Sequence, residues 1–208
     1  MWYWLKKLSE WLAYPPMQES DKKLFFKKEH LDELSLGGSS TVVGSLTQAA
    51  IHWGCERIDV KLDQTSLIFS ADIKGRWPRF RILCDNPIKC LENLARDKVD
   101  FGEYELCRAL LRAFSFEPAK IFIHQGPTTR GGSTSRALEF NFDLQEINQI
   151  FARGGIEGLN FSVERARNVN VSTEELYLKT ADFPSTLSVY LNDVLLFGLP
   201  SGRRPGSD

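Results

Sequence analysis

The chain has 208 residues, of which 42% are hydrophobic and 25% are charged. These proportions are typical of a folded globular protein and exclude a wholly disordered chain. The formal net charge is −1, so the chain lacks the basic excess that nucleic acids favour, and no nucleic-acid partner is predicted.

The four cysteines show no metal-binding spacing, because no two of them form a Cys-x-x-Cys pair. Most stand within apolar runs, where cysteine usually serves as a small buried hydrophobic residue. Reduced thiols are typical of the cell interior, so we expect a cytoplasmic protein. No apolar stretch in the sequence is long enough to cross a bilayer.

An aromatic segment, residues 1–16, is the first predicted element. Trp4, Leu8 and Trp11 recur at helical spacing, which predicts an amphipathic helix that ends at Pro15-Pro16. One interpretation is docking on a protein partner, with a second copy of this chain as one candidate, because exposed Trp and Tyr favour interfaces. The other is a membrane surface, since Trp and Lys suit the headgroup boundary.

Residues 17–200 are predicted to form one domain, and the tail 201–208, rich in Gly, Arg, Pro and Ser, is predicted to be disordered. Residues 18–33 are strongly charged, which predicts a solvated helix or a connector. The helical stretch from Ser45 to Trp53 and the residues just before it are nearly apolar all round, so this helix should be central and buried. Its predicted cap is one of Ser39, Ser40 and Thr41.

Apolar periodicity and turn residues predict the rest of the domain. The predicted strands are 57–62, 66–73, 80–84, 120–124, 137–142, 159–165, 187–191 and 194–197. The predicted helices are 87–99, 104–114, 144–151 and 173–181, the last capped by Ser172 or Thr173. The hairpins imply antiparallel pairing, so we expect an α+β fold: a two-layer α/β sandwich with a mixed, mostly antiparallel sheet and helices on one face.

The order of elements between Ser45 and Phe142 resembles the GHKL superfamily of ATP-binding domains. The segment from Ser45 to Val60 looks like that family's first motif helix and the strand after it. The strand that runs into Asp85-Asn86 looks like the family strand that ends in Asp-Asn-Gly. Phe101-Gly102-Glu103 resembles the end of the family's lid, where a helix begins.

The resemblance implies a nucleotide site for ATP or ADP. Asp85, with Asn86 beside it, would accept a hydrogen bond from the adenine amino group, a role that suits an acceptor-only carboxylate. Gly102 would let phosphates approach a helix N-terminus. A hydroxyl at Ser133 or Thr134 would close the site from the hairpin. The alternative is that Asp85-Asn86 belongs to a turn after a strand.

Three positions depart from the family pattern. The glutamate that activates water is replaced by Ser45, and the asparagine that holds magnesium is replaced by Ala49. Serine without a partner is a poor base, and alanine offers no oxygen ligand. Pro87 stands where the family has a glycine.

The sequence therefore favours a degenerate GHKL-like domain that serves as a binding or interaction module without ATP hydrolysis. Two alternatives stay open. The first is an adenine-nucleotide-binding protein that uses Asp85. The second is a peripheral membrane protein anchored by its N-terminal helix.

Overall fold

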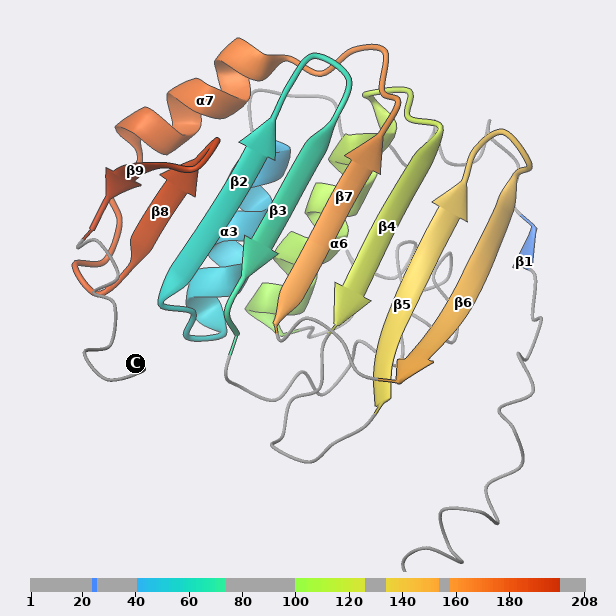
Figure 1. Ribbon diagram of the computed structural model, residues 1–208, viewed down its shortest axis with the longest axis horizontal. Coiled ribbons are helices and arrows are strands. Elements are labelled where there is room, and N and C mark those ends of the chain that lie inside the picture. The colour runs from blue at the N-terminus through green and yellow to red at the C-terminus, as the bar shows by residue number, and fades with distance from the viewer. Residues whose placement is uncertain (1–23, 26–40, 74–99, 126–133, 154–157, 199–208) are drawn as a thin grey trace, which may run out of the picture.

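The computed structural model describes residues 24–25, 41–73, 100–125, 134–153 and 158–198 (Figure 1). The helices of this part of the chain are α3 (Val42–His52), α6 (Phe101–Phe114) and α7 (Val171–Thr180). Its strands are β1 (Leu24–Phe25), β2 (Arg57–Leu62), β3 (Leu67–Ala71), β4 (Lys120–Gln125), β5 (Thr134–Asn141), β6 (Glu146–Arg153), β7 (Leu159–Glu164), β8 (Ser188–Leu191) and β9 (Val194–Phe197).

The strands form one sheet in the order β1-β6-β5-β4-β7-β3-β2-β8-β9. Strands β2 and β8 pair in parallel, and every other neighbouring pair is antiparallel. Figure 1 shows α3 and α6 side by side on one face of this sheet. The predicted two-layer α/β sandwich, with a mixed and mostly antiparallel sheet, is therefore confirmed.

The core lies between the sheet and these two helices. In β2, Ile58, Val60 and Leu62 are buried while the alternate residues are more exposed, as the period of a half-buried strand requires. Helix α3 is buried along most of its length and begins at Thr41, whose Oγ1 accepts a hydrogen bond from the Gly44 N–H at 2.8 Å. The predictions of a central helix and of its cap are both confirmed.

The prediction of a helix over residues 144–151 is wrong, because this segment forms β6. Ile147 and Ile150 lie three residues apart, which fits one face of a helix, but β6 pairs with β5 along its whole length. This pairing satisfies the backbone N–H and C=O groups that a helix would have paired internally. A tight turn leads into the strand, with Gln145 at a φ of 54°. Cross-strand pairing therefore outweighs a local helical spacing here.

Two smaller differences concern the ends of elements. Helix α7 is capped by Asn170, whose side chain accepts from the Thr173 N–H at 3.1 Å, rather than by Ser172 or Thr173. Within the charged segment 18–33, Leu24 and Phe25 form the short edge strand β1. Among the described helices, none has the length and apolar character needed to cross a membrane.

Several predicted elements lie outside the described residues. These are the N-terminal helix 1–16, the strand 80–84, the helix 87–99 and the tail 201–208. The cysteines that the structure describes, Cys55 and Cys107, are buried thiols that are not part of a disulfide. Burial, helped by the charge of Asp72, raises the pKa of Cys55 to about 12, so this thiol stays protonated at neutral pH.

Candidate functional site

The end of α3 lies beside the start of α6, because the two helices run antiparallel. Helix α3 ends at His52 with Trp53 as its C-cap, and Gly54 turns the chain away with a φ of 75°. Helix α6 begins at Phe101 with Asp100 as its N-cap. These residues form the α3–α6 junction, which carries Gly102, the position that the resemblance assigns to phosphate binding.

The Asp100 carboxylate occupies the N-terminal end of α6. Its Oδ1 accepts hydrogen bonds from the Gly102 N–H at 3.0 Å, the Glu103 N–H at 3.3 Å and the Trp53 Nε1–H at 3.2 Å. Its Oδ2 lies 2.9 Å from His52 Nε2. The N-terminus of a helix attracts anions through its free N–H groups and its dipole. Here the chain supplies that anion itself.

The environment keeps this carboxylate charged. Burial alone would raise the pKa of Asp100, but it is outweighed by hydrogen bonds from His52, the Glu103 amide and Trp53, together with the charge of His52, so the pKa is lowered. Ionised Asp100 is therefore the state that the junction stabilises.

The indole of Trp53 covers Gly102. A Cβ added at Gly102 would lie 2.5 Å from Trp53 Cε2 and 2.6 Å from its Nε1, closer than atoms of a side chain normally approach. The indole ring of Trp53 thus fills the volume that a side chain at position 102 would occupy. The glycine matters here because it lets α3 and α6 approach closely.

Ser45 and Ala49, which replace the family's glutamate and asparagine, both lie in buried parts of α3. Ser45 is 3% exposed, and its Oγ accepts a hydrogen bond from Nη1 of Arg112 on α6. Ala49 is fully buried and carries no oxygen on its side chain. The residues at these two positions therefore do not fit the magnesium and water-activating groups of the family.

Glu174 of α7 fixes the N-terminus of α3. Its Oε1 and Oε2 accept hydrogen bonds from the N–H groups of Val42 and Val43 at 3.0 and 2.8 Å, and the residue is 3% exposed. Burial raises the pKa of Glu174, and this effect outweighs the two backbone hydrogen bonds and the charge of Arg112. The cap at the start of the central helix thus comes from a residue about 130 positions later in the chain. Local sequence patterns could not reveal this contact.

Asp72 is an acidic residue at the end of a strand that was not among the predicted site residues. Strand β3 pairs with β2, ends at Ala71 and is followed directly by Asp72. The Asp72 Oδ1 accepts from the N–H groups of Glu56 and Arg57 at 2.9 and 2.7 Å. The sequence does carry a pattern that points to Asp72, because an acidic residue follows directly after a run of alternating apolar residues. The predicted strand 66–73 included Asp72, so the residue was not recognised as the end of a strand.

Four further predicted site residues are Asp85, Asn86, Ser133 and Thr134. Asp85, Asn86 and Ser133 lie outside the described residues, and their roles stay predictions. Thr134 begins β5, opposite Arg153 of β6, and its proposed role also stays a prediction. Within the described ranges, no group of three or more His, Cys, Asp or Glu side chains is placed to hold a metal ion.

No protein-family model and no curated protein sequence matches the chain. Among solved structures, the ATPase region of Saccharomyces cerevisiae topoisomerase II is similar, with a TM-score of 0.51 and 11% identity over 75% of this chain and 48% of that one. The same region bound to ICRF-187 (dexrazoxane) gives a TM-score of 0.50 and 10% identity over 74% and 48%. The ATPase domain of Aquifex aeolicus MutL, a bacterial mismatch repair endonuclease, gives 0.48 and 11% over 77% and 60%.

The chain spans about half the length of the topoisomerase II structures that it resembles. At identities this low, similarity of structure establishes the fold and leaves the activity open. The chain therefore has the fold of the GHKL ATP-binding domains.

Proposed function

We propose that this chain is a GHKL-fold binding module that does not hydrolyse ATP by the mechanism of that family. The observation that carries the proposal is the occupied start of α6. Asp100 takes the N–H groups of Gly102 and Glu103, and Trp53 covers the glycine. A phosphate at this helix end would meet a carboxylate of like charge.

The two replaced positions on α3 support the same proposal. A general base must reach the proton that it removes, and the Ser45 hydroxyl instead accepts a hydrogen bond from Arg112. Magnesium needs oxygen ligands, and Ala49 provides none. Both departures remove chemistry while leaving the packing of α3 intact.

A hydrolysis assay tests this proposal. Purified chain incubated with ATP and magnesium should release phosphate no faster than a protein-free blank. Ser45→Ala is the matched control, because it removes the hydroxyl and keeps the small side chain. A release rate above the blank that saturates with ATP and falls in Ser45→Ala would overturn the proposal.

Adenine-nucleotide binding without hydrolysis is the second candidate function, and Asp72 is the observation that favours it. Within the described residues, hydrogen bonds reach only its Oδ1, so Oδ2 is left as an acceptor. A ligand that binds the folded state raises the melting temperature by mass action. We expect ATP and ADP to raise it for the wild type and not for Asp72→Asn. An unchanged melting temperature at millimolar nucleotide would remove this candidate.

We also infer that the module binds a protein partner through the Trp-rich segment 1–16, with a second copy of the chain as one occupant. The support is the amphipathic pattern of that segment in the sequence. Light scattering of the full chain and of a chain that starts after Pro16 tests self-association, which predicts a smaller mass for the shorter chain. Equal monomer masses would contradict it. Co-sedimentation with liposomes lost on the same truncation would instead favour the membrane-surface alternative.

A further inference from the structure

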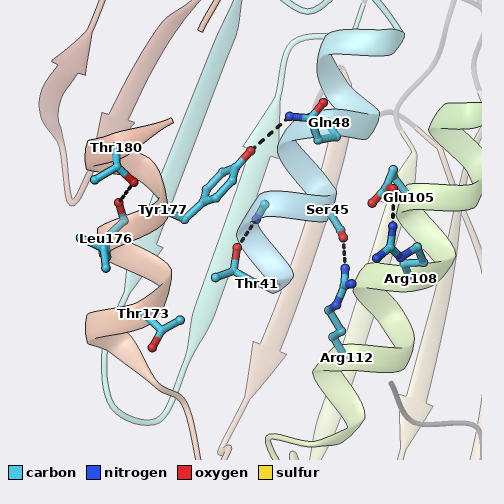
Figure 2. A pocket seen from close by; sticks show the side chains of 11 residues that line it. Thr41, Ser45, Gln48, Glu105, Arg108, Arg112, Thr173, Leu176, Tyr177 and Thr180 are labelled. Atoms are coloured by element: carbon cyan, nitrogen blue, oxygen red, sulfur yellow. Dashed lines mark hydrogen bonds and ion pairs between the residues drawn. The ribbon is translucent and has the colours of Figure 1, made fainter. Parts of the chain in front are cut away.

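A pocket of about 380 Å³ lies across one face of α3, between α6 and α7 (Figure 2). Its floor is formed by Thr41, Gly44, Ser45 and Gln48, which recur at the spacing of one helix face. Its volume lies in the range of small-molecule sites. The pocket is therefore large enough for an organic ligand.

The two walls of the pocket differ in chemistry. Figure 2 shows Arg108 and Arg112 of α6 on one side and Tyr177 of α7 on the other. The Tyr177 hydroxyl accepts a hydrogen bond from Gln48 Nε2 at 3.3 Å, which sets the ring against the floor. Leu176, 59% exposed, adds an apolar side chain at the rim. One wall is thus cationic and the other is aromatic and apolar.

The cationic wall presents two guanidinium groups on one helix face. Arg108 and Arg112 are four residues apart, so their side chains point the same way. Arg108 donates from Nη1 to Glu105 Oε1 at 2.8 Å, which uses one of its five N–H groups. Arg112 donates to the Ser45 hydroxyl on the floor. Both cations therefore lie at the surface that a ligand would touch.

The charges of the pocket favour an anion. Its lining holds two arginines and one carboxylate, Glu105. Glu174 lies nearby but directs both carboxylate oxygens to the N–H groups at the start of α3. Arg112 is only 6% exposed. Burial, followed by the charge of Arg108, lowers its pKa, and the charges of Glu105 and Glu174 act in the opposite direction.

We propose that this pocket binds a small molecule that carries a phosphate group, with the phosphate at Arg108 and Arg112 and the organic part against Tyr177 and Leu176. Phosphate oxygens accept hydrogen bonds from several directions, which suits two guanidinium groups and nearby hydroxyls better than a planar carboxylate does.

The pocket is separate from the α3–α6 junction. None of Trp53, Asp100 and Gly102 lines the pocket, and its nearest lining residues, Gln48 and Glu105, stand about one helical turn away from the junction. Phosphate binding in this pocket therefore needs neither the start of α6 nor any hydrolytic chemistry. The two proposals can fail separately. Phosphate binding in the pocket is tested by a binding measurement, whereas the proposed function is tested by a measurement of phosphate release from ATP.

Calorimetric titration of the full chain with phenyl phosphate and inorganic phosphate, at constant ionic strength, tests the proposal. We expect saturable binding of both, with phenyl phosphate tighter because its ring contacts Tyr177 and Leu176. Leu176→Glu puts a carboxylate at the rim and should weaken phenyl phosphate by about fivefold or more. Leu144→Glu is the matched control, because Leu144 is 61% exposed in a turn that does not line the pocket. Its affinity should stay within about twofold of wild type.

Arg108→Gln provides a second arm, with Arg167→Gln, 80% exposed and outside the pocket, as its control. The first should lose binding and the second should keep it. The proposal is overturned if phenyl phosphate shows no saturable binding, or if each variant and its control weaken it equally. Equal affinity for benzoate would overturn the assignment to phosphate.

Discussion

The indole Nε1–H of Trp53 donates to Oδ1 of Asp100 at 3.2 Å, which ties the residue that follows α3 to the residue that precedes α6. The same oxygen accepts the first free N–H groups of α6. The helix end that the resemblance to GHKL domains assigns to phosphate is thus occupied by a carboxylate and an indole of this chain.

Gly102→Ala should destabilise the fold. The new Cβ would lie 2.5 Å from Trp53 Cε2, and a rigid indole between two helices has little room to move. Overpacking of this kind costs about 1–3 kcal/mol, partly offset by the higher helix propensity of Ala, about 1 kcal/mol. Urea unfolding should therefore show a net loss. A variant more stable than the wild type would show that Trp53 does not pack as described. As a control, Gly102→Ala combined with Trp53→Leu should recover most of the lost stability, because the smaller side chain leaves room for the new Cβ.

Asp100→Ala should weaken the start of α6 more than Asp100→Asn does. Asparagine keeps an oxygen that can accept from the backbone, whereas alanine removes the cap, which typically costs about 1 kcal/mol. The two variants should also differ from the wild type in how their stability depends on pH, because neither has a carboxyl group at position 100 to titrate. The pKa of Asp100 is lowered in the folded state, so its contribution is present above the ordinary carboxyl pKa and is lost as the pH falls through the lowered value.

Unfolding of these Asp100 variants in urea, repeated at acidic and neutral pH, checks both expectations. The difference in unfolding free energy between wild type and Asp100→Asn should shrink in acid. Equal stability of the Ala and Asn variants would show that the cap contributes nothing.

Glu174→Gln should change the pH dependence of stability in the opposite sense. The pKa of Glu174 is raised by burial in the folded state. Its contribution is therefore present below the ordinary glutamate pKa of about 4.3 and is lost as the pH rises through the raised folded value. Relative to Glu174→Gln, the wild type should be more stable near pH 4 than near pH 7. Urea midpoints across this range measure the difference, and an advantage that grows with pH would contradict this account.

Patterns within a few residues predicted most of the fold. The alternation of Ile58, Val60 and Leu62 predicted β2. The hydroxyl residues Ser39, Ser40 and Thr41 predicted where α3 starts, and Thr41 is the one that caps it. The helical spacing of Ile147 and Ile150 led to the wrong prediction of a helix. Hydrogen bonding with β5 makes this segment a strand instead. Local patterns are weak wherever distant segments supply the hydrogen bonds.

The candidate site was harder to predict, because its contacts join distant residues. Gly102 and Ser45 were identified from the sequence, but their neighbours were not. The contact of Trp53 with Gly102, the bond of Arg112 with Ser45 and the Glu174 cap each link segments that come together only in the folded chain. The sequence shows which residue stands at each candidate position, such as Ser45 and Gly102. It does not show which distant residues contact that position in the folded chain.

The most direct test restores the missing groups of α3 while leaving the α3–α6 junction intact. Ser45→Glu combined with Ala49→Asn returns a carboxylate and an amide to the family positions. Beside Arg112, the new glutamate should form an ion pair, and Asp100 with Trp53 should still occupy the start of α6. Phosphate release from ATP and magnesium by this folded double variant is predicted to equal the protein-free blank. Release above the blank that saturates with ATP would contradict the account, because it would mean that the start of α6 is open to phosphate.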